Sequence, residues 1–159
     1  MKRLALCIGV LAVVSGLCGA VAHAQPDPRL DPTYGSKKLK TGFLPDPFKK
    51  EVVAGGPIKT NLGNVNAYVA KAPDFRLEFK AGNLPLTFYV KCDKDTTLLI
   101  NLPDGTWIAD DDSGGNLNPL IRLANPKSGI YDIYVGSYKE GENPKAMLHI
   151  TELEVKKVK

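Results

Sequence analysis

The stretch FRLEFK at positions 75–80 decides the fold class, because apolar and charged side chains alternate in it without interruption. A period of two places successive side chains on opposite faces of a β-strand. We therefore expect Phe75, Leu77 and Phe79 to share the face that packs into a core.

The stretch YDIYV at positions 131–135 shows a second alternation of this kind. Its odd-numbered positions are expected inside, and Asp132 and Tyr134 are expected to face water. No window of the sequence carries a convincing apolar stripe of helical period, so the sequence predicts an all-β fold.

Short strand-like runs recur along the chain between turn signals that are rich in glycine, proline, asparagine and aspartate. Such spacing is typical of a β-sandwich, and we expect about seven to nine antiparallel strands. The expected strands are residues 50–54, 67–70, 76–80, 87–91, 96–102, 106–109, 120–124, 130–137 and 146–155. The residues expected to be buried are Leu77, Phe79, Phe88, Val90, Leu98, Ile100, Tyr131, Ile133 and Val135.

The first 24 residues have the three parts of a secretory signal peptide. Lys2 and Arg3 precede an apolar stretch at positions 4–21, and positions 22–24 read Ala-His-Ala. The alternative is a membrane anchor, since the apolar stretch is long enough to span a bilayer. The small residues and the cleavage pattern favour removal after Ala24, which predicts a periplasmic or secreted protein with no transmembrane segment in the mature chain.

The remainder of the chain has the length of one domain. Prolines are frequent in the segment that follows the leader, which disfavours a helix there. We interpret residues 25–37 as a flexible linker and residues 38–159 as the β-sandwich domain, which opens with an extended segment at 38–48.

Charge and cysteine content exclude several classes of partner. Of the 21 basic residues, Lys2 and Arg3 leave with the leader, so 19 remain against 17 acidic residues. A net charge of +2 gives no basis for a nucleic acid or an anionic membrane as partner. Cys92 is the one cysteine that remains, and we expect it to be a reduced, buried thiol.

The segment 103–119 is the densest group of candidate ligands. Its aspartates repel one another unless water or a cation relieves them, and Ca²⁺ prefers carboxylate and carbonyl oxygens. The alternative is a polar connection whose aspartates accept backbone hydrogen bonds. The spacing is not that of an EF-hand. The candidate Ca²⁺ ligands are Asp104, Asp110, Asp111, Asp112, Asn116 and Asn118.

Catalytic patterns are weak. His149 is the one histidine outside the leader and lies in a strand-like run, and no serine sits in a G-x-S-x-G turn. Cys92 with His149 is a poor nucleophile–base pair, and Asp110 with Asp112 lie in a loop where a raised pKa is not expected. Zinc spacing and a phosphate loop are absent. We expect a protein that is not an enzyme.

The run 95–138 carries the marks of a known family: DTTLLIN at 95–101, PDGTW at 103–107, DDDSGG at 110–115 and SGIYDIYVG at 128–136. In these it resembles the bacterial pre-peptidase C-terminal domains and is similar to clostridial collagen-binding domains. The resemblance implies a jelly-roll β-sandwich that serves as an accessory module of secreted peptidases, with Ca²⁺ bound in some members. The segment 42–47 looks like stand-alone periplasmic relatives, so we expect a domain without an attached peptidase.

These observations predict an exported, non-catalytic binding or structural module that Ca²⁺ stabilises, with an unidentified protein or polysaccharide as ligand. Two alternatives stay open. One is a secreted hydrolase that uses the loop from Asp110 to Asn118. The other is a partner or inhibitor of an exported peptidase.

Export is directly testable. Intact-mass spectrometry of the exported protein should give Gln25 as the first residue, because the signal peptidase cuts after the small-x-small pattern. A mature form that still begins at Met1 would contradict the prediction.

Overall fold

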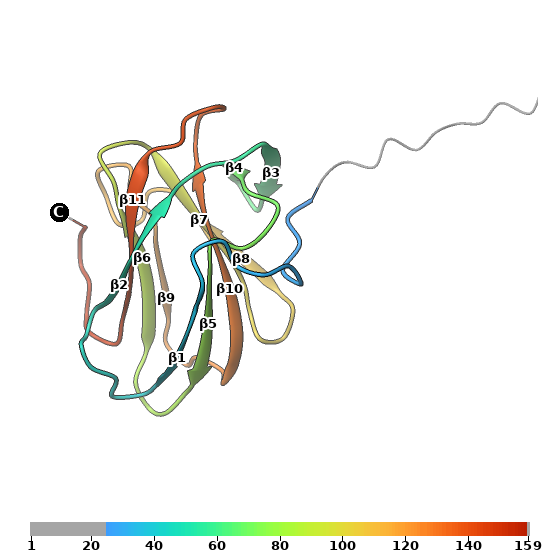
Figure 1. Ribbon diagram of the computed structural model, residues 1–159. Helices are drawn as coiled ribbons and strands as arrows, with labels where there is room; N and C mark the ends of the chain where they lie inside the picture. The colour runs from blue at the N-terminus through green and yellow to red at the C-terminus, as the bar shows by residue number, and fades with distance from the viewer. Residues whose placement is uncertain (1–24, 159) are drawn as a thin grey trace, which may run out of the picture.

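The computed structural model describes residues 25–158 and consists of strands and connections, with no helix among these residues (Figure 1). The predicted signal peptide lies outside the described residues. The strands are β1 (Ser36–Lys40), β2 (Phe48–Val53), β3 (Ile58–Leu62), β4 (Val65–Val69), β5 (Phe75–Lys80), β6 (Leu86–Lys91), β7 (Thr96–Asn101), β8 (Trp107–Asp110), β9 (Leu120–Leu123), β10 (Gly129–Ser137) and β11 (Lys145–Thr151).

The eleven strands form two sheets that pack face to face. Sheet A has seven strands, of which β5-β10-β7-β8 form its antiparallel body, with β1 beside β5 and the hairpin β3–β4 attached to β10. Sheet B contains β2-β11-β6-β9 in antiparallel order. From β5 onward the chain crosses between the sheets at nearly every connection, which is the winding of a jelly roll. The predicted all-β jelly-roll sandwich is confirmed, with eleven strands in place of seven to nine.

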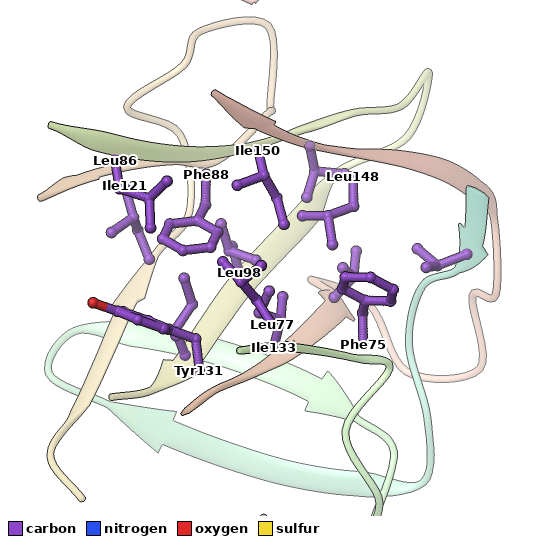
Figure 2. Close-up of a cluster of buried hydrophobic side chains, with 14 of the residues drawn as sticks. Phe75, Leu77, Leu86, Phe88, Leu98, Ile121, Tyr131, Ile133, Leu148 and Ile150 are labelled. Carbon is purple, nitrogen blue, oxygen red and sulfur yellow. The ribbon is translucent and has the colours of Figure 1, made fainter. Parts of the chain in front are cut away.

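The core lies between the two sheets, and all nine residues that we expected to be buried are at most 2% exposed. Figure 2 shows side chains of sheet B, among them Phe88, Leu148 and Ile150, facing Leu77, Ile133 and Tyr131 of sheet A. The alternation of side chains along each strand therefore determines which residues lie in the core, because each sheet turns one face toward the other sheet.

The outer face of sheet A corrects one expectation. We expected Asp132 and Tyr134 to face water, but both are buried. The hairpin β3–β4 packs across β7 and β8 as a partial third layer and covers Tyr134. Asp132 accepts a hydrogen bond of 2.6 Å from Arg76 Nε, so its charge is paired. The hairpin and the outer face of sheet A thus enclose a second, smaller hydrophobic cluster, whose buried residues are Ile58, Ala67, Val69, Leu99 and Tyr134.

The segment interpreted as a linker is hydrogen-bonded to the domain. The amides of Asp27, Thr33 and Tyr34 donate to carbonyls of residues 71–74 at 2.8 Å. Strand β1 crosses the boundary that we predicted between residues 37 and 38, and pairs in parallel with β5 at the edge of sheet A. The prolines of the preceding segment, at positions 26, 28 and 32, lie before β1 and therefore do not interrupt its pairing.

The last strand ends earlier than the sequence suggested. We expected a strand over residues 146–155, but β11 ends at Thr151. The amide of Glu152 donates to Asp46 at 3.1 Å, and the Glu152 carboxylate accepts from Thr41 Oγ1 and Gly42 N at 2.6 Å each. These bonds turn the chain away from sheet B.

Strand β10 changes partners at Val135. Up to Ile133 its edge pairs with β5, and at Ser137 it pairs with β4. Between them the amide of Val135 donates to the Asp74 carboxylate at 2.7 Å, and its carbonyl accepts from Gly55 N at 2.8 Å. At Val135 the Asp74 carboxylate thus accepts the backbone hydrogen bond that a neighbouring strand would otherwise accept. Burial raises the pKa of Asp74 to about 7, although the bond from Val135 opposes the shift.

Truncation of a core residue in β10 tests the packing. Ile133→Ala should destabilise the fold by about 2–5 kcal/mol, because the side chain is fully buried. Ile130→Ala in the same strand is the control, since Ile130 is 48% exposed and should change stability by less than about 0.5 kcal/mol. Denaturant unfolding measures both, and equal effects would contradict the assigned faces.

Asp74 should make stability depend on pH. The native state holds the proton up to about pH 7 while the unfolded carboxyl loses it near 3.8, so stability falls as the pH rises between these values. Asp74→Asn keeps an acceptor for Val135 N and cannot ionise. The variant should lose less stability than wild type between about pH 4 and pH 8, by on the order of 1–4 kcal/mol. Parallel pH profiles of unfolding would contradict the assignment.

Candidate metal centre

The loop between β8 and β9 contains most of the predicted calcium ligands, and it lies at the end of the sandwich that Figure 1 shows uppermost, beside the connections β6–β7 and β10–β11. Asp110 ends β8 and is already engaged. Its Oδ2 accepts from Leu120 N at 2.8 Å and from Ser113 N at 3.0 Å. This is the backbone-capping role that aspartate has in turns.

The two predicted asparagine ligands also have internal roles. Asn118 is buried, accepts from Cys92 N at 2.8 Å and donates to the carbonyl of Asn116 at 2.9 Å. Asn116 has a left-handed φ of 56° and donates to the carbonyl of Val158 at 3.3 Å. The amide of Val158 donates to Gly114 O at 2.8 Å, so the end of the chain is bound to this loop.

Asp104 lies away from the other predicted ligands, in the turn between β7 and β8 and therefore at the opposite end of β8. Its carboxylate accepts from Lys127 Nζ at 2.6 Å and from Thr106 N at 3.1 Å. The side-chain bonds from Lys127 and then Thr106 hold the pKa of Asp104 well below its usual range. The structure does not bring Asp104 to the loop.

Asp111 and Asp112 do come together, and they are joined by Asp95, which directly precedes β7. One carboxylate oxygen from each of the three lies within 4.8 Å of the others. Sequence reasoning missed Asp95, although the predicted hairpin over β7 and β8 contained the signal. Pairing of Leu98 with Asp110 places Asp95 opposite the start of the β8–β9 loop.

Two carboxylate oxygens of this triad are poorly satisfied. Oδ1 of Asp95 and Oδ1 of Asp111 are buried and accept no hydrogen bond in the described part of the chain. No lysine or arginine among residues 25–158 forms an ion pair with the triad. A buried charged oxygen without a partner is unfavourable, so the triad is electrostatically unfavourable in the absence of a cation.

Electrostatics within the triad point the same way. Burial, followed by the charges of Asp112 and Asp95, raises the pKa of Asp111 to about 6. Burial and then Asp112 raise the pKa of Asp95. A divalent cation would reverse both effects, because it stabilises the ionised form of every ligand.

The donor set fits a hard cation. Three carboxylates offer up to six oxygens, and Ca²⁺ takes six to eight oxygen ligands that include waters and carbonyls. No cysteine or histidine belongs to the triad, which disfavours zinc. The arrangement can therefore hold Ca²⁺ through Asp95, Asp111 and Asp112, with solvent completing the shell.

His149 and Cys92, which were also weighed for catalysis, lie outside the triad. His149 is buried on β11 with its ring stacked on Tyr89 at 4.4 Å, and burial lowers its pKa. Cys92 is free but only half-buried, so the expectation that this thiol is buried was wrong. It follows the end of β6, where Lys94 N donates to its sulfur at 3.4 Å.

Comparison with models of known protein families finds no match for this chain, and comparison with curated protein sequences finds no similar protein. The resemblance to pre-peptidase C-terminal domains thus stays a prediction. Between residues 25 and 158 no helix is long and apolar enough to cross a bilayer.

Proposed function

We propose that the chain is a non-catalytic binding or structural module whose folded state is stabilised by Ca²⁺ at Asp95, Asp111 and Asp112. The observation that carries this proposal is the meeting of three carboxylates from two loops, with a buried oxygen on Asp95 and another on Asp111 that lack partners. Such a group is unfavourable by itself and favourable around a cation.

The proposed site replaces the larger set suggested by the sequence. Asp110, Asn116 and Asn118 support the loop through hydrogen bonds, so they position the ligands and need not touch the ion. Within this segment, Asp110 therefore has the hydrogen-bonding role of a turn aspartate, whereas Asp111 and Asp112 are the proposed metal ligands.

A hydrolase that uses this loop is less well supported. A glycosidase pair needs an acid and a carboxylate on either side of a bound substrate, at about 5–9.5 Å. Asp111 and Asp112 are neighbours in the chain, and the larger hollows found among residues 25–158 are lined by other residues. The adjacent carboxylates suit an ion better than a sugar.

Export fits the same proposal. The predicted signal peptide places the domain in the periplasm or outside the cell, where a jelly-roll module resembling pre-peptidase C-terminal domains serves a peptidase in trans or stands alone. Extracellular Ca²⁺ modules bind at about 10⁻⁴–10⁻³ M, which suits a site with three protein ligands.

Calcium should raise the melting temperature of the wild-type protein. At ten times Kd the gain is about 1.4 kcal/mol, or about 5 °C for a domain of this size. Asp111→Asn and Asp112→Asn should lose this shift, because each removes a charged ligand. In chelator Asp112→Asn should melt no lower than wild type, since it also removes a like charge beside Asp111.

Asp104→Asn is the matched control. It removes an aspartate from the same sequence segment, but one whose carboxylate is bound to Lys127 at the other end of β8. This variant should keep the full calcium shift. If wild type melts at the same temperature with millimolar Ca²⁺ and with chelator, the calcium proposal fails.

A further inference from the structure

The end of the sandwich opposite the metal centre is formed in part by two adjoining loops, residues 41–47 between β1 and β2 and residues 81–85 between β5 and β6. Figure 1 shows both at the lower end of the molecule. They are in contact, because a Cβ placed on Gly82 would overlap the side chain of Thr41. We call these two loops, with the flanking strand ends, the basal surface.

Leucines project from the basal surface. Leu44 is 87% exposed, and Leu84 is 45% exposed. Beside Leu44 an open groove of about 570 Å³ runs between the edges of β1 and β2, with Leu39 and Phe48 among its lining residues. A single exposed leucine is common on soluble proteins, so it is the grouping of Leu44 and Leu84 on adjoining loops beside an apolar-lined groove that indicates a contact surface.

Leu44 is held in place by the carboxylates of Glu152, which is buried, and Asp46, which is half-buried. The Glu152 carboxylate accepts from Thr41 and from Gly42 N, and Asp46 accepts from Thr151 Oγ1 and Glu152 N. Both ends of the short loop are thus fixed to the end of β11. The leucine is presented by a braced loop, and the two carboxylates that brace it are turned inward.

The lysines around the loops are uncompensated. Lys37 and Lys49 line the groove, and Lys40 lies directly opposite Lys80 in the β1–β5 register. None of these four forms an ion pair with a carboxylate in the described structure. Like charges directly opposite each other are destabilising in a sheet, and an anionic surface relieves that repulsion.

We propose that the basal surface docks on an anionic lipid bilayer, with Leu44 and Leu84 in the headgroup layer and Lys37, Lys40, Lys49 and Lys80 against the lipid phosphates. Apolar insertion together with basic residues is the combination that holds peripheral proteins at such surfaces. The net charge of the mature chain gave no hint of this, because a net charge does not report that these four lysines lie far from the acidic triad in the fold.

The orientation keeps the acidic triad away from the lipids. Strands of about six residues span about 20 Å, or roughly two Debye lengths at physiological ionic strength. Repulsion between Asp95, Asp111, Asp112 and the bilayer is therefore screened. A bilayer is favoured over an acidic protein, because a protruding leucine enters a fluid headgroup layer without a matching pocket.

The test is binding of the exported protein to vesicles of phosphatidylcholine with and without about 30% phosphatidylglycerol, in chelator. The chelator keeps this test independent of calcium, so its failure leaves the proposed metal centre unaffected. Wild type should bind the anionic vesicles, bind neutral ones weakly and be released as salt is raised. Lys40→Gln/Lys80→Gln should weaken binding about 25-fold, at about fivefold for each lysine.

Controls come from the other end of the molecule. Leu44→Ser should weaken binding severalfold, whereas Leu117→Ser, at a leucine that is 51% exposed, should not. Lys139→Gln/Lys145→Gln removes two exposed lysines and should also have no effect. All variants should melt like wild type, since every changed side chain is exposed.

Three outcomes would overturn the proposal. The first is absence of binding to anionic vesicles by folded wild-type protein. The second is equal binding to neutral vesicles, or equal losses in the basal and control variants. The third is competition by polyglutamate at a concentration that leaves a purely lipid-binding peptide on the vesicles, which would assign the basal surface to an acidic protein.

Discussion

Strand β10 is the element on which the rest of the structure depends. It is paired on one edge by β7 and on the other by β5, then by the Asp74 carboxylate, then by β4. Its inner face carries the core of the jelly roll, and its outer face is covered by the β3–β4 hairpin. A strand enclosed in this way fixes the register of sheet A, because a shift by one residue would exchange Ile133 for a charged neighbour.

Strand pairing in these sheets determines where the loop residues lie. Pairing of β7 with β8 carries Asp95 to the acidic pair that follows β8, and the turn at the far end of the same hairpin holds Asp104 against Lys127. From β5 onward successive strands run in opposite directions, so alternate connections lie at opposite ends of the sandwich. The same alternation places the acidic triad at one end of the sandwich and the facing pair Lys40 and Lys80 at the other.

Alternation alone was sufficient to predict the core, as the FRLEFK stretch of β5 shows, because only one face of that strand meets apolar partners. It failed for Tyr134, since the cover on that residue comes from a hairpin some 70 residues earlier in the chain. Asp95 was missed because composition was counted within one loop, whereas the triad depends on strand register. The sequence predicted that residues from 38 onward are extended, but not that β1 pairs with β5. Lysines are common on edge strands because they discourage further pairing, and the same lysines are equally typical of a solvated segment.

The end of the chain has a bearing on how the acidic loop responds to an ion. Val158 is buried against Gly114, where an added Cβ would lie 2.7 Å from its Cγ2, and Asn118 ties the same loop to Cys92. The loop is thus already ordered by its neighbours on both sides, and an arriving ion would find its carboxylates near their final places. Binding an ion would then cost little conformational entropy, so the loop is a preorganised site rather than a segment that folds when the ion binds.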